Sequence, residues 1–305
     1  MLRYLTLRIA QSIVTVLLVT MIIFVIIRLI GDPTHLMLPP EATEADRELL
    51  RQQMGLSDPV AVQYWRYLLQ LLHGDMGMSY RFSLPALDVV LGRIGPTLLL
   101  TCTSLAIGIL VGVPLGVASA VRPDGWIDFV AKAIALFGQA APPFFFGLIF
   151  VLVFAVQLRW LPTSGYGGPQ YLIMPAIALG WYSAAGLMRL TRSNMMEVLT
   201  SEYVRMARIK GVPERVVVYK HALKNAALPV LTFASLQFGI LMGGAVSIES
   251  VFAWPGMGKL ILDSIANLDY AVVQAAVTVS ALMFTAINLA VDLLYAYIDP
   301  RIRYA

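Results

Sequence analysis

Charged residues are scarce in this sequence, since only 13% of its 305 residues are Asp, Glu, Lys or Arg. A soluble domain usually has about 25%. The single cysteine, Cys102, excludes an intrachain disulfide and is predicted to be a small packing residue. The three histidines lie far apart in the sequence, which argues against a metal site built from them. The segment Gly256-Met257-Gly258-Lys259 lacks the spacing and the Ser or Thr of a nucleotide-binding phosphate loop.

Long apolar runs are abundant instead, with 59% hydrophobic residues and a mean hydropathy of +0.77. Each uncharged run has at least 18 residues, and roughly 20 are needed to cross the hydrocarbon of a bilayer as a helix. Core helices of soluble proteins rarely run that long without a charge. We therefore predict an all-α membrane protein with six transmembrane helices. The predicted spans are Ile9–Ile27, Thr97–Val121, Ala133–Leu158, Tyr171–Met188, Ala226–Ile248 and Tyr270–Val291.

The distribution of Lys and Arg predicts that both termini are cytoplasmic. With the N-terminus inside, 14 of the 22 basic residues fall in cytoplasmic segments, as the positive-inside rule requires. The first span is predicted to be retained, because its apolar run is too long for a signal peptide and no small-residue cleavage site follows it. The net charge of +4 is therefore explained by topology, and nucleic-acid binding is not predicted.

Acidic residues are almost absent from the predicted spans, with Asp292 as the exception. A proton-driven carrier generally needs a buried titratable group, so an ion-coupled secondary carrier is the less favoured alternative. No residue pattern of an intramembrane protease is found, and the chain is predicted not to be an enzyme. Uphill transport would then need energy from another subunit.

The segment between the first two spans, residues 31–93, is predicted to form a small external helical segment. Thr43 and Asp46 fit a capping box at the start of one helix. A second helix contains Trp65 and Tyr67 and carries leucines at helical spacing. It is interpreted either as a surface that receives a partner or substrate, or as an interfacial helix whose Trp65 and Tyr67 lie in the aromatic belt.

Glycine and proline mark packing and hinge positions in the spans. Gly108, Gly112 and Gly116 form two overlapping G-x-x-x-G steps, which place small residues on one helix face for close helix packing. Pro142-Pro143 interrupts the third span and frees backbone carbonyls. This pair predicts either a broken helix beside a translocation path or a static kink.

A basic loop, Arg189–Asn225, separates the fourth and fifth spans and carries eight Lys or Arg against three Glu. Such a loop must lie in water on the cytoplasmic side. Apolar residues at helical spacing from Met195 to Ile209 predict one amphipathic helix that ends at Gly211, and Pro213 can begin a second helix. The loop is interpreted as a docking surface or as an amphipathic helix on anionic lipid.

The stretch SEYVRMARIKGVPERVVVYKHALKNAALPV resembles the cytoplasmic "EAA" loop of ABC-importer permeases of the dipeptide/oligopeptide/nickel/glutathione family. GDMGMS, LPTSGY, GGAVSIESVFAWPGMGKL and DPRIRYA are also typical of this family, so the resemblance covers nearly the whole chain. Val212-Pro213 departs from the usual Leu-Ser at the turn. The resemblance implies ATPase coupling for Glu202, Tyr203, Arg205, Ala207, Arg208, Lys210, Gly211 and Pro213.

The resemblance also implies a type I ABC importer permease fold in a bacterial inner membrane. Its expected divisions are a first transmembrane helix (1–30), an external helical segment (31–93), a five-helix transmembrane domain (94–297) that contains the coupling loop (189–225), and a cytoplasmic tail (298–305). A homologous second permease, two cytoplasmic ATPase subunits that bind ATP and Mg, an external substrate-binding protein and membrane lipid are the expected partners. No cofactor or metal is expected on this chain.

The segment Val251–Leu260 is, by the same resemblance, an external gate or a contact for the binding protein. Phe252, Trp254, Pro255 and Gly256 are its candidate residues, although Phe252 and Trp254 could instead be interfacial anchors. Di- or oligopeptides are the first expected substrates and glutathione is the second, while nickel chelates and opine-like compounds are further alternatives.

Overall fold

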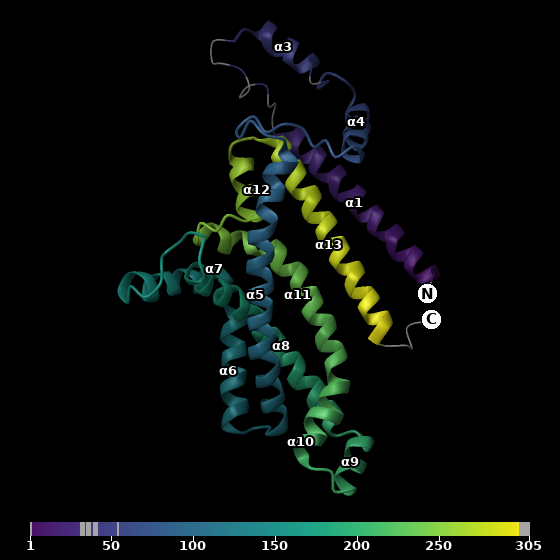
Figure 1. Cartoon of the computed structure of the whole chain (residues 1–305), viewed down its shortest axis with the longest axis vertical. Coiled ribbons are helices and arrows are strands. Elements are labelled where there is room, and N and C mark those ends of the chain that lie inside the picture. Colours follow the sequence, from purple (N-terminus) through teal and green to yellow (C-terminus); the bar gives the residue numbers. More distant parts are fainter. Residues whose placement is uncertain (1, 31–33, 35–37, 39–41, 54, 299–305) are drawn as a thin grey trace. The chain divides into compact units, whose positions relative to one another are not determined.

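The computed structural model describes residues 2–30, 34, 38, 42–53 and 55–298, and every regular element in these ranges is helical (Figure 1). The chain divides into two compact units, one formed by Met1–Gly95 with Gly256–Ala305 and the other by Pro96–Pro255. Helix α5 (Ala86–Val121) begins in the first unit and continues into the second.

The first unit pairs the first and last long helices, which pack side by side (Figure 1). Its buried core gathers small and β-branched side chains around Val90, Val272 and Ala275. Besides the start of α5, its helices are α1 (Leu2–Ile30), α3 (Glu44–Gln53), α4 (Val60–Leu72), α12 (Met257–Ala266) and α13 (Tyr270–Ile298).

Hydrogen bonds of the external segment confirm the capping box, since Thr43 N donates to Asp46 Oδ2 at 2.9 Å and Asp46 N donates to Thr43 Oγ1 at 3.2 Å. The interpretation of Tyr67 as an aromatic-belt residue is wrong. Its ring is buried, and its hydroxyl lies 2.9 Å from Thr278 Oγ1 of α13. Trp65 lies on the other side of α4 with 62% of its surface exposed, so only this ring is available to an interface.

The second unit packs its helices around a core that contains Leu100, Leu179, Ile248, Phe252 and Trp254. Two of its segments are π-helical, and both continue directly from an α-helix. In chain order after α5, the unit consists of α6 (Trp126–Ala140), α7 (Pro143–Phe150), the π-helical η1 (Val151–Gln157), α8 (Pro169–Leu199), α9 (Glu202–Ile209), α10 (Glu214–Val216), the π-helical η2 (Val217–Ala222) and α11 (Leu223–Val251).

Five helices among the described residues are long and apolar enough to cross a membrane, and a sixth crossing results if α6 and the α7–η1 pair form one broken span. The third predicted span, Ala133–Leu158, is therefore not one straight helix, because its two halves meet at 101°. Pro142 has an extended backbone and Pro143 begins α7. Neither proline has an N–H to donate, so the helical hydrogen bonds stop after Ala140.

Cys102 is exposed on α5, so any packing role of this residue is not within this chain. The Asp292 side chain and the tail from residue 299 lie outside the described part of the chain.

Candidate functional site

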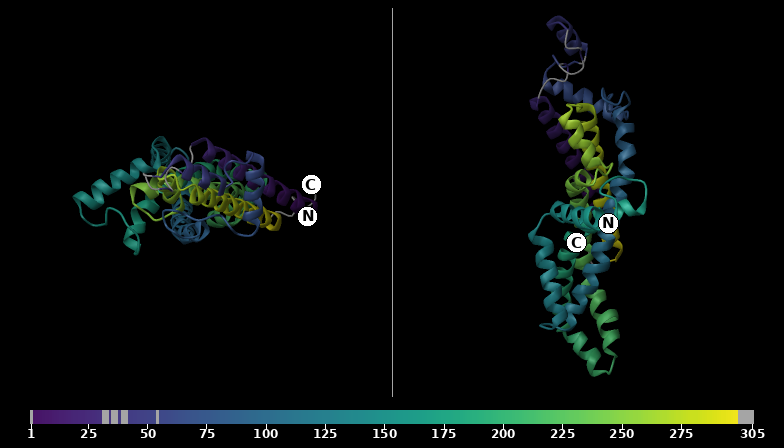
Figure 2. Two further views of the ribbon diagram at one scale, coloured as in Figure 1. Left: turned by 90° about the horizontal axis from the view of Figure 1, so that it is seen from above. Right: turned by 90° about the vertical axis from the view of Figure 1, so that its left-hand side faces the viewer.

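A compact helical hairpin, α9 followed by α10, connects the end of α8 to η2 and α11, and it lies at one end of the second unit (Figure 1 and the right-hand view of Figure 2). The hydroxyl of Thr200 donates to Glu197 O at 2.8 Å, and that of Ser201 donates to Val198 O at 2.5 Å. These bonds satisfy carbonyls at the end of α8. Ser201 is extended and separates α8 from α9.

This break overturns one prediction from the sequence. Apolar residues from Met195 to Ile209 do not share one helix, because α8 ends at Leu199 and α9 begins at Glu202. The first part of the predicted loop, Arg189–Leu199, is the last part of α8. Serine and threonine compete for backbone hydrogen bonds, which explains the interruption within a continuous apolar pattern.

Gly211 ends α9 at the position where the sequence predicted the helix to stop. Its φ of +74° is in the left-handed region, which favours glycine. Gly211 N donates to Arg208 O at 3.0 Å and Val212 N donates to Ala207 O at 3.2 Å. These are the two bonds of a Schellman cap. Pro213, at φ −57°, then precedes α10.

An apolar face of α9 is exposed. Tyr203, Met206 and Ile209 recur every three residues and are 44%, 52% and 71% exposed. Val204 faces the opposite way and is fully buried. Short helices rarely leave three large apolar side chains in water without a partner, so this face is suited to docking. Charged residues surround it, namely Glu202, Arg205, Arg208 and Lys210.

Arg208 holds the hairpin together. Its guanidinium pairs with both carboxylate oxygens of Glu214, at 3.2 Å from Nε and 2.8 Å from Nη2, across the Gly211 turn. Its Nη1 also donates to Leu199 O at 3.3 Å. The Glu214 carboxylate raises the pKa of Arg208. Arg208 thus connects the end of α8, α9 and α10.

The hairpin rests on a small buried cluster. Val117 of α5, Met195 of α8 and Val218 of η2 pack together there with three alanines. Asn225 adds a polar contact, because its Nδ2 donates to the Tyr203 hydroxyl at 2.8 Å. The cluster joins α5, α8 and α11, and α9 contacts this part of the unit through η2 and α8.

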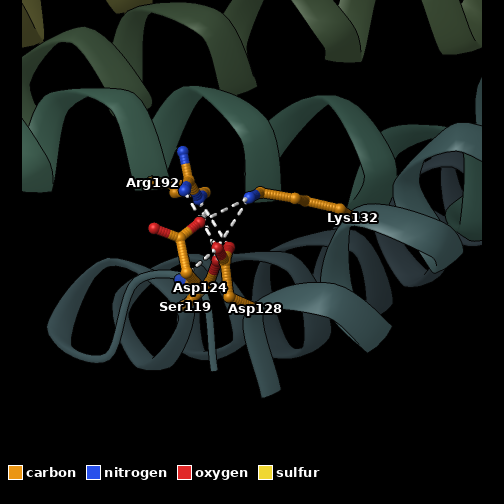
Figure 3. Close-up of polar contacts among 5 residues, drawn as sticks. All are labelled: Ser119, Asp124, Asp128, Lys132 and Arg192. Atoms are coloured by element: carbon orange, nitrogen blue, oxygen red, sulfur yellow. Dashed lines mark hydrogen bonds and ion pairs between the residues drawn. The ribbon is translucent and has the colours of Figure 1, made fainter. Parts of the chain in front are cut away.

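A buried ion-pair network lies beside this cluster (Figure 3). Asp128 of α6 is fully buried, and both its oxygens accept from Arg192 of α8, at 2.7 Å from Nε and 3.1 Å from Nη2. Lys132 Nζ lies 2.7 Å from the same carboxylate. Ser119 Oγ of α5 and the backbone N–H of Asp124 also donate to it. The network thereby fastens α5, α6 and α8 to one another.

Helix α5 packs closely against α8 at Gly108, Gly112 and Gly116. A Cβ added to Gly108 would lie 2.8 Å from Ser183 Cβ, and one on Gly112 would lie 2.5 Å from Ala184 O. A Cβ on Gly116 would lie 2.7 Å from the Met188 carbonyl oxygen. These distances are shorter than van der Waals contact, so any side chain there would separate the two backbones.

Gly112→Ala is expected to lower the free energy of unfolding by about 1–3 kcal/mol, because the methyl group meets a backbone carbonyl that cannot rotate away. Gly92→Ala in the same helix is the control, since nothing lies within 4 Å of its added Cβ. Thermal unfolding of the purified protein in detergent measures both. Equal melting temperatures for the two variants would contradict the close approach.

The other end of the second unit contains the pattern FAWP, of which Phe252 and Trp254 are buried. Trp254 Nε1 donates to Pro96 O at 2.9 Å, and its ring meets Tyr166 edge to face at 4.9 Å. Gly165 N donates to Phe252 O at 2.9 Å. Both Phe252 and Trp254 are 1% exposed. The alternative that they are interfacial anchors is therefore wrong.

The chain around this pattern turns sharply. Ala253 has φ +47°, Pro255 follows it, and Gly256 precedes α12 as its N-cap. Alpha-helix α7 also reaches this corner, since a Cβ added to Gly147 would lie 3.1 Å from the Phe252 ring. The segment after the Pro142-Pro143 break thus packs against the candidate gate residues.

Sequence reasoning missed the buried carboxylates. Asp128 and Glu249 are both fully buried, and Glu249 accepts from Thr97 Oγ1 at 2.8 Å. Asp128 and Arg192 are 64 residues apart, so no local pattern joins them. Arg208 and Glu214 are only six residues apart across a glycine turn, so their opposite charges could have predicted this ion pair from the sequence.

The chain is similar to known proteins over its whole length. Residues 112–304 match the family model "Binding-protein-dependent transport system inner membrane component", and residues 1–98 match the N-terminal model of the same membrane component. The chain is 43% identical to the glutathione transport system permease protein GsiC of Salmonella paratyphi A and 42% identical to that of Escherichia coli (strain K12). Both alignments cover 305 residues and 100% of each protein.

A solved structure supports the fold. A chain of the MetNI methionine ABC transporter, in an inward facing conformation, matches with a TM-score of 0.59 and 18% identity. The match covers 69% of this chain and 96% of that chain.

Proposed function

Because the chain belongs to the family of binding-protein-dependent ABC-importer permeases of the inner membrane, we propose that it forms half of the path of an ATP-driven importer. We propose glutathione or another small peptide as the substrate, since full-length relatives are named for glutathione transport. Nickel chelates, opines and other small solutes are the alternatives within the same importer class.

The observation that carries the proposal is the exposed apolar face of α9 on a firmly held hairpin. Tyr203, Met206 and Ile209 provide a surface that a groove on an ATPase subunit can enclose. Arg208 fixes the hairpin to α8 through Leu199 O, and the bond from Asn225 Nδ2 to the Tyr203 hydroxyl joins it to α11. A displacement of α9 is therefore transmitted to the long helices through these hydrogen bonds and not only through the connecting chain.

The remaining parts of the importer follow from this role. The hairpin faces the cytoplasm with both chain termini, and two ATPase subunits there bind ATP and Mg. A homologous second permease completes the path, and an external binding protein delivers the substrate. The corner of Phe252, Trp254, Pro255 and Gly256 then lies outside as a gate or docking point, and the break at Pro142-Pro143 lies beside the path. Binding of ATP would favour one of two arrangements of these parts.

Substitutions on the apolar face test the coupling role. Met206→Asp is expected to abolish co-purification of the ATPase subunits, because it places a charge in the centre of the proposed contact. Leu72→Asp is the matched control, since Leu72 is an exposed apolar residue of α4 in the other unit. Retention of the ATPase by Met206→Asp at the wild-type level would exclude α9 as the docking helix.

Reconstitution tests the importer class and the substrate. Proteoliposomes with the permease pair, the ATPases and the binding protein should take up labelled glutathione only with ATP and Mg. Uptake by this chain alone, driven by an ion gradient, would favour the secondary carrier. A dipeptide or a nickel chelate that replaces glutathione as the preferred cargo would change the substrate and leave the importer class intact.

A further inference from the structure

A cavity of about 260 Å³ with a mixed polar and apolar lining lies in the first unit, bordered by α1, α4 and α13. Two arginines, Arg28 and Arg66, line it together with the amide side chains of Gln63, Gln70 and Gln274. It contains no residue of the hairpin or of the Phe252–Gly256 corner. Such a lining, rich in N–H donors, is suited to a ligand that accepts hydrogen bonds.

Arg28 is held rigidly at this cavity. Its Nε donates to Gln63 Oε1 at 2.8 Å, its Nη1 donates to Phe24 O at 3.2 Å, and its guanidinium carbon lies 3.3 Å from the centre of the Phe24 ring. Gln63 is itself buried and donates to the carbonyls of Leu56 and Asp58, at 3.0 and 2.7 Å. The guanidinium therefore has a fixed position before any ligand binds, which lowers the entropic cost of binding.

The charge of Arg28 is not neutralised by any carboxylate that the structure describes. Arg66 does have such a partner, since its Nη1 lies 2.6 Å from Asp58 Oδ2. A guanidinium carries five N–H donors, and the contacts above occupy only two of those on Arg28. Burying half of a cation without a nearby counter-charge costs desolvation free energy, and an anion bound in the cavity would offset that cost.

The position of Arg66 depends on a glycine. Gly55 has φ +64°, and a Cβ added to it would lie 2.7 Å from Arg66 Nη1. The missing side chain thus leaves room for the second guanidinium at the edge of the cavity. Two guanidiniums and neighbouring amides can together bind the oxygens of one anion, since each arginine presents a planar fork of donors.

We propose that this cavity binds one oxyanion, a phosphate or carboxylate group, through Arg28 and Arg66. Arg28 provides a positive charge that no carboxylate in the described part of the chain neutralises, and Arg66 provides further N–H donors beside it. The phosphate of a phospholipid headgroup and the anionic group of a soluble solute share this chemistry.

One experiment with two arms distinguishes a lipid headgroup from a soluble anion. Both arms use the full-length chain in phosphatidylcholine nanodiscs. In the first arm, inorganic phosphate and acetate are titrated by calorimetry. In the second arm, phosphatidylglycerol is added to the nanodiscs, and its retention is counted by native mass spectrometry. We expect saturable binding in one of the arms, with a stoichiometry of one per chain.

Arg28→Met is expected to weaken this binding at least tenfold, and Arg66→Met, which alters a half-exposed side chain and spares the fold, is expected to weaken it severalfold. Arg81→Met is the matched control, because Arg81 is exposed in the same unit and does not line the cavity. The absence of saturable binding in both arms would overturn the proposal. An equal loss of binding in Arg81→Met and Arg66→Met would overturn it as well.

Discussion

Asp128→Ala is expected to lower the free energy of unfolding by about 3 kcal/mol, which is the lower end of the range for breaking a buried ion pair. The variant leaves Arg192, whose side chain is only 21% exposed, without its carboxylate. Lys132 is 49% exposed and can turn to solvent, which is why the expected loss is not larger. Denaturant unfolding of the purified protein measures the effect, together with ATP-driven uptake.

Two further variants make this result specific. Asp124→Ala removes a carboxylate that is 92% exposed and 3.7 Å from the same lysine, so its expected cost is below about 1 kcal/mol. The double variant Asp128→Ala with Arg192→Met removes both charges and should recover part of the lost stability. If Asp128→Ala and Asp124→Ala were equally stable, the network would have no structural role.

Gly211→Pro is expected to abolish ATP-driven uptake while the permease still inserts in the membrane. Proline fixes φ near −65°, whereas the Schellman cap needs the observed +74°. It also removes the N–H that donates to Arg208 O. The turn then opens, and the apolar face of α9 leaves the position fixed by Arg208. The ratio of transport to ATP hydrolysis in proteoliposomes measures the uncoupling.

Gly74→Pro is a closely matched control. Gly74 follows α4 with φ +76°, its N–H donates to Leu71 O at 3.0 Å, and no atom lies within 4 Å of its added Cβ. The local cost of the substitution is therefore the same at both glycines. We expect Gly74→Pro to keep ATPase co-purification at the wild-type level. Loss of co-purification in both variants would point to general destabilisation and not to the hairpin.

Features that depend only on neighbouring residues were predicted correctly from the sequence. They are the capping box at Thr43, the end of α9 at Gly211 and the interruption at Pro142-Pro143, and each follows from the backbone properties of the residues present. Uncharged length predicted five of the six spans as single long helices, because every backbone polar group must be satisfied internally in lipid, while the third predicted span is a bent pair of helices.

Contacts between distant segments could not be predicted in this way. The buried carboxylates of Asp128 and Glu249 depend on Arg192 and Thr97, which helix packing brings near them. The end of α8 was also missed, because Thr200 and Ser201 are common in helices and loops alike. Whether they interrupt a helix depends on the hydrogen bonds available to them.

Helix α8 has a mechanical consequence that follows from its length. Its 31 residues span about 45 Å at 1.5 Å per residue. Arg192 and the glycine contacts hold it between Ser183 and Arg192, close to its middle, so a rigid α8 would pivot there. A tilt of about 10° moves each end of a rod of that length by roughly 4 Å in opposite directions. A small displacement at the hairpin would then produce one of similar size at Pro169, with no change in the helix itself.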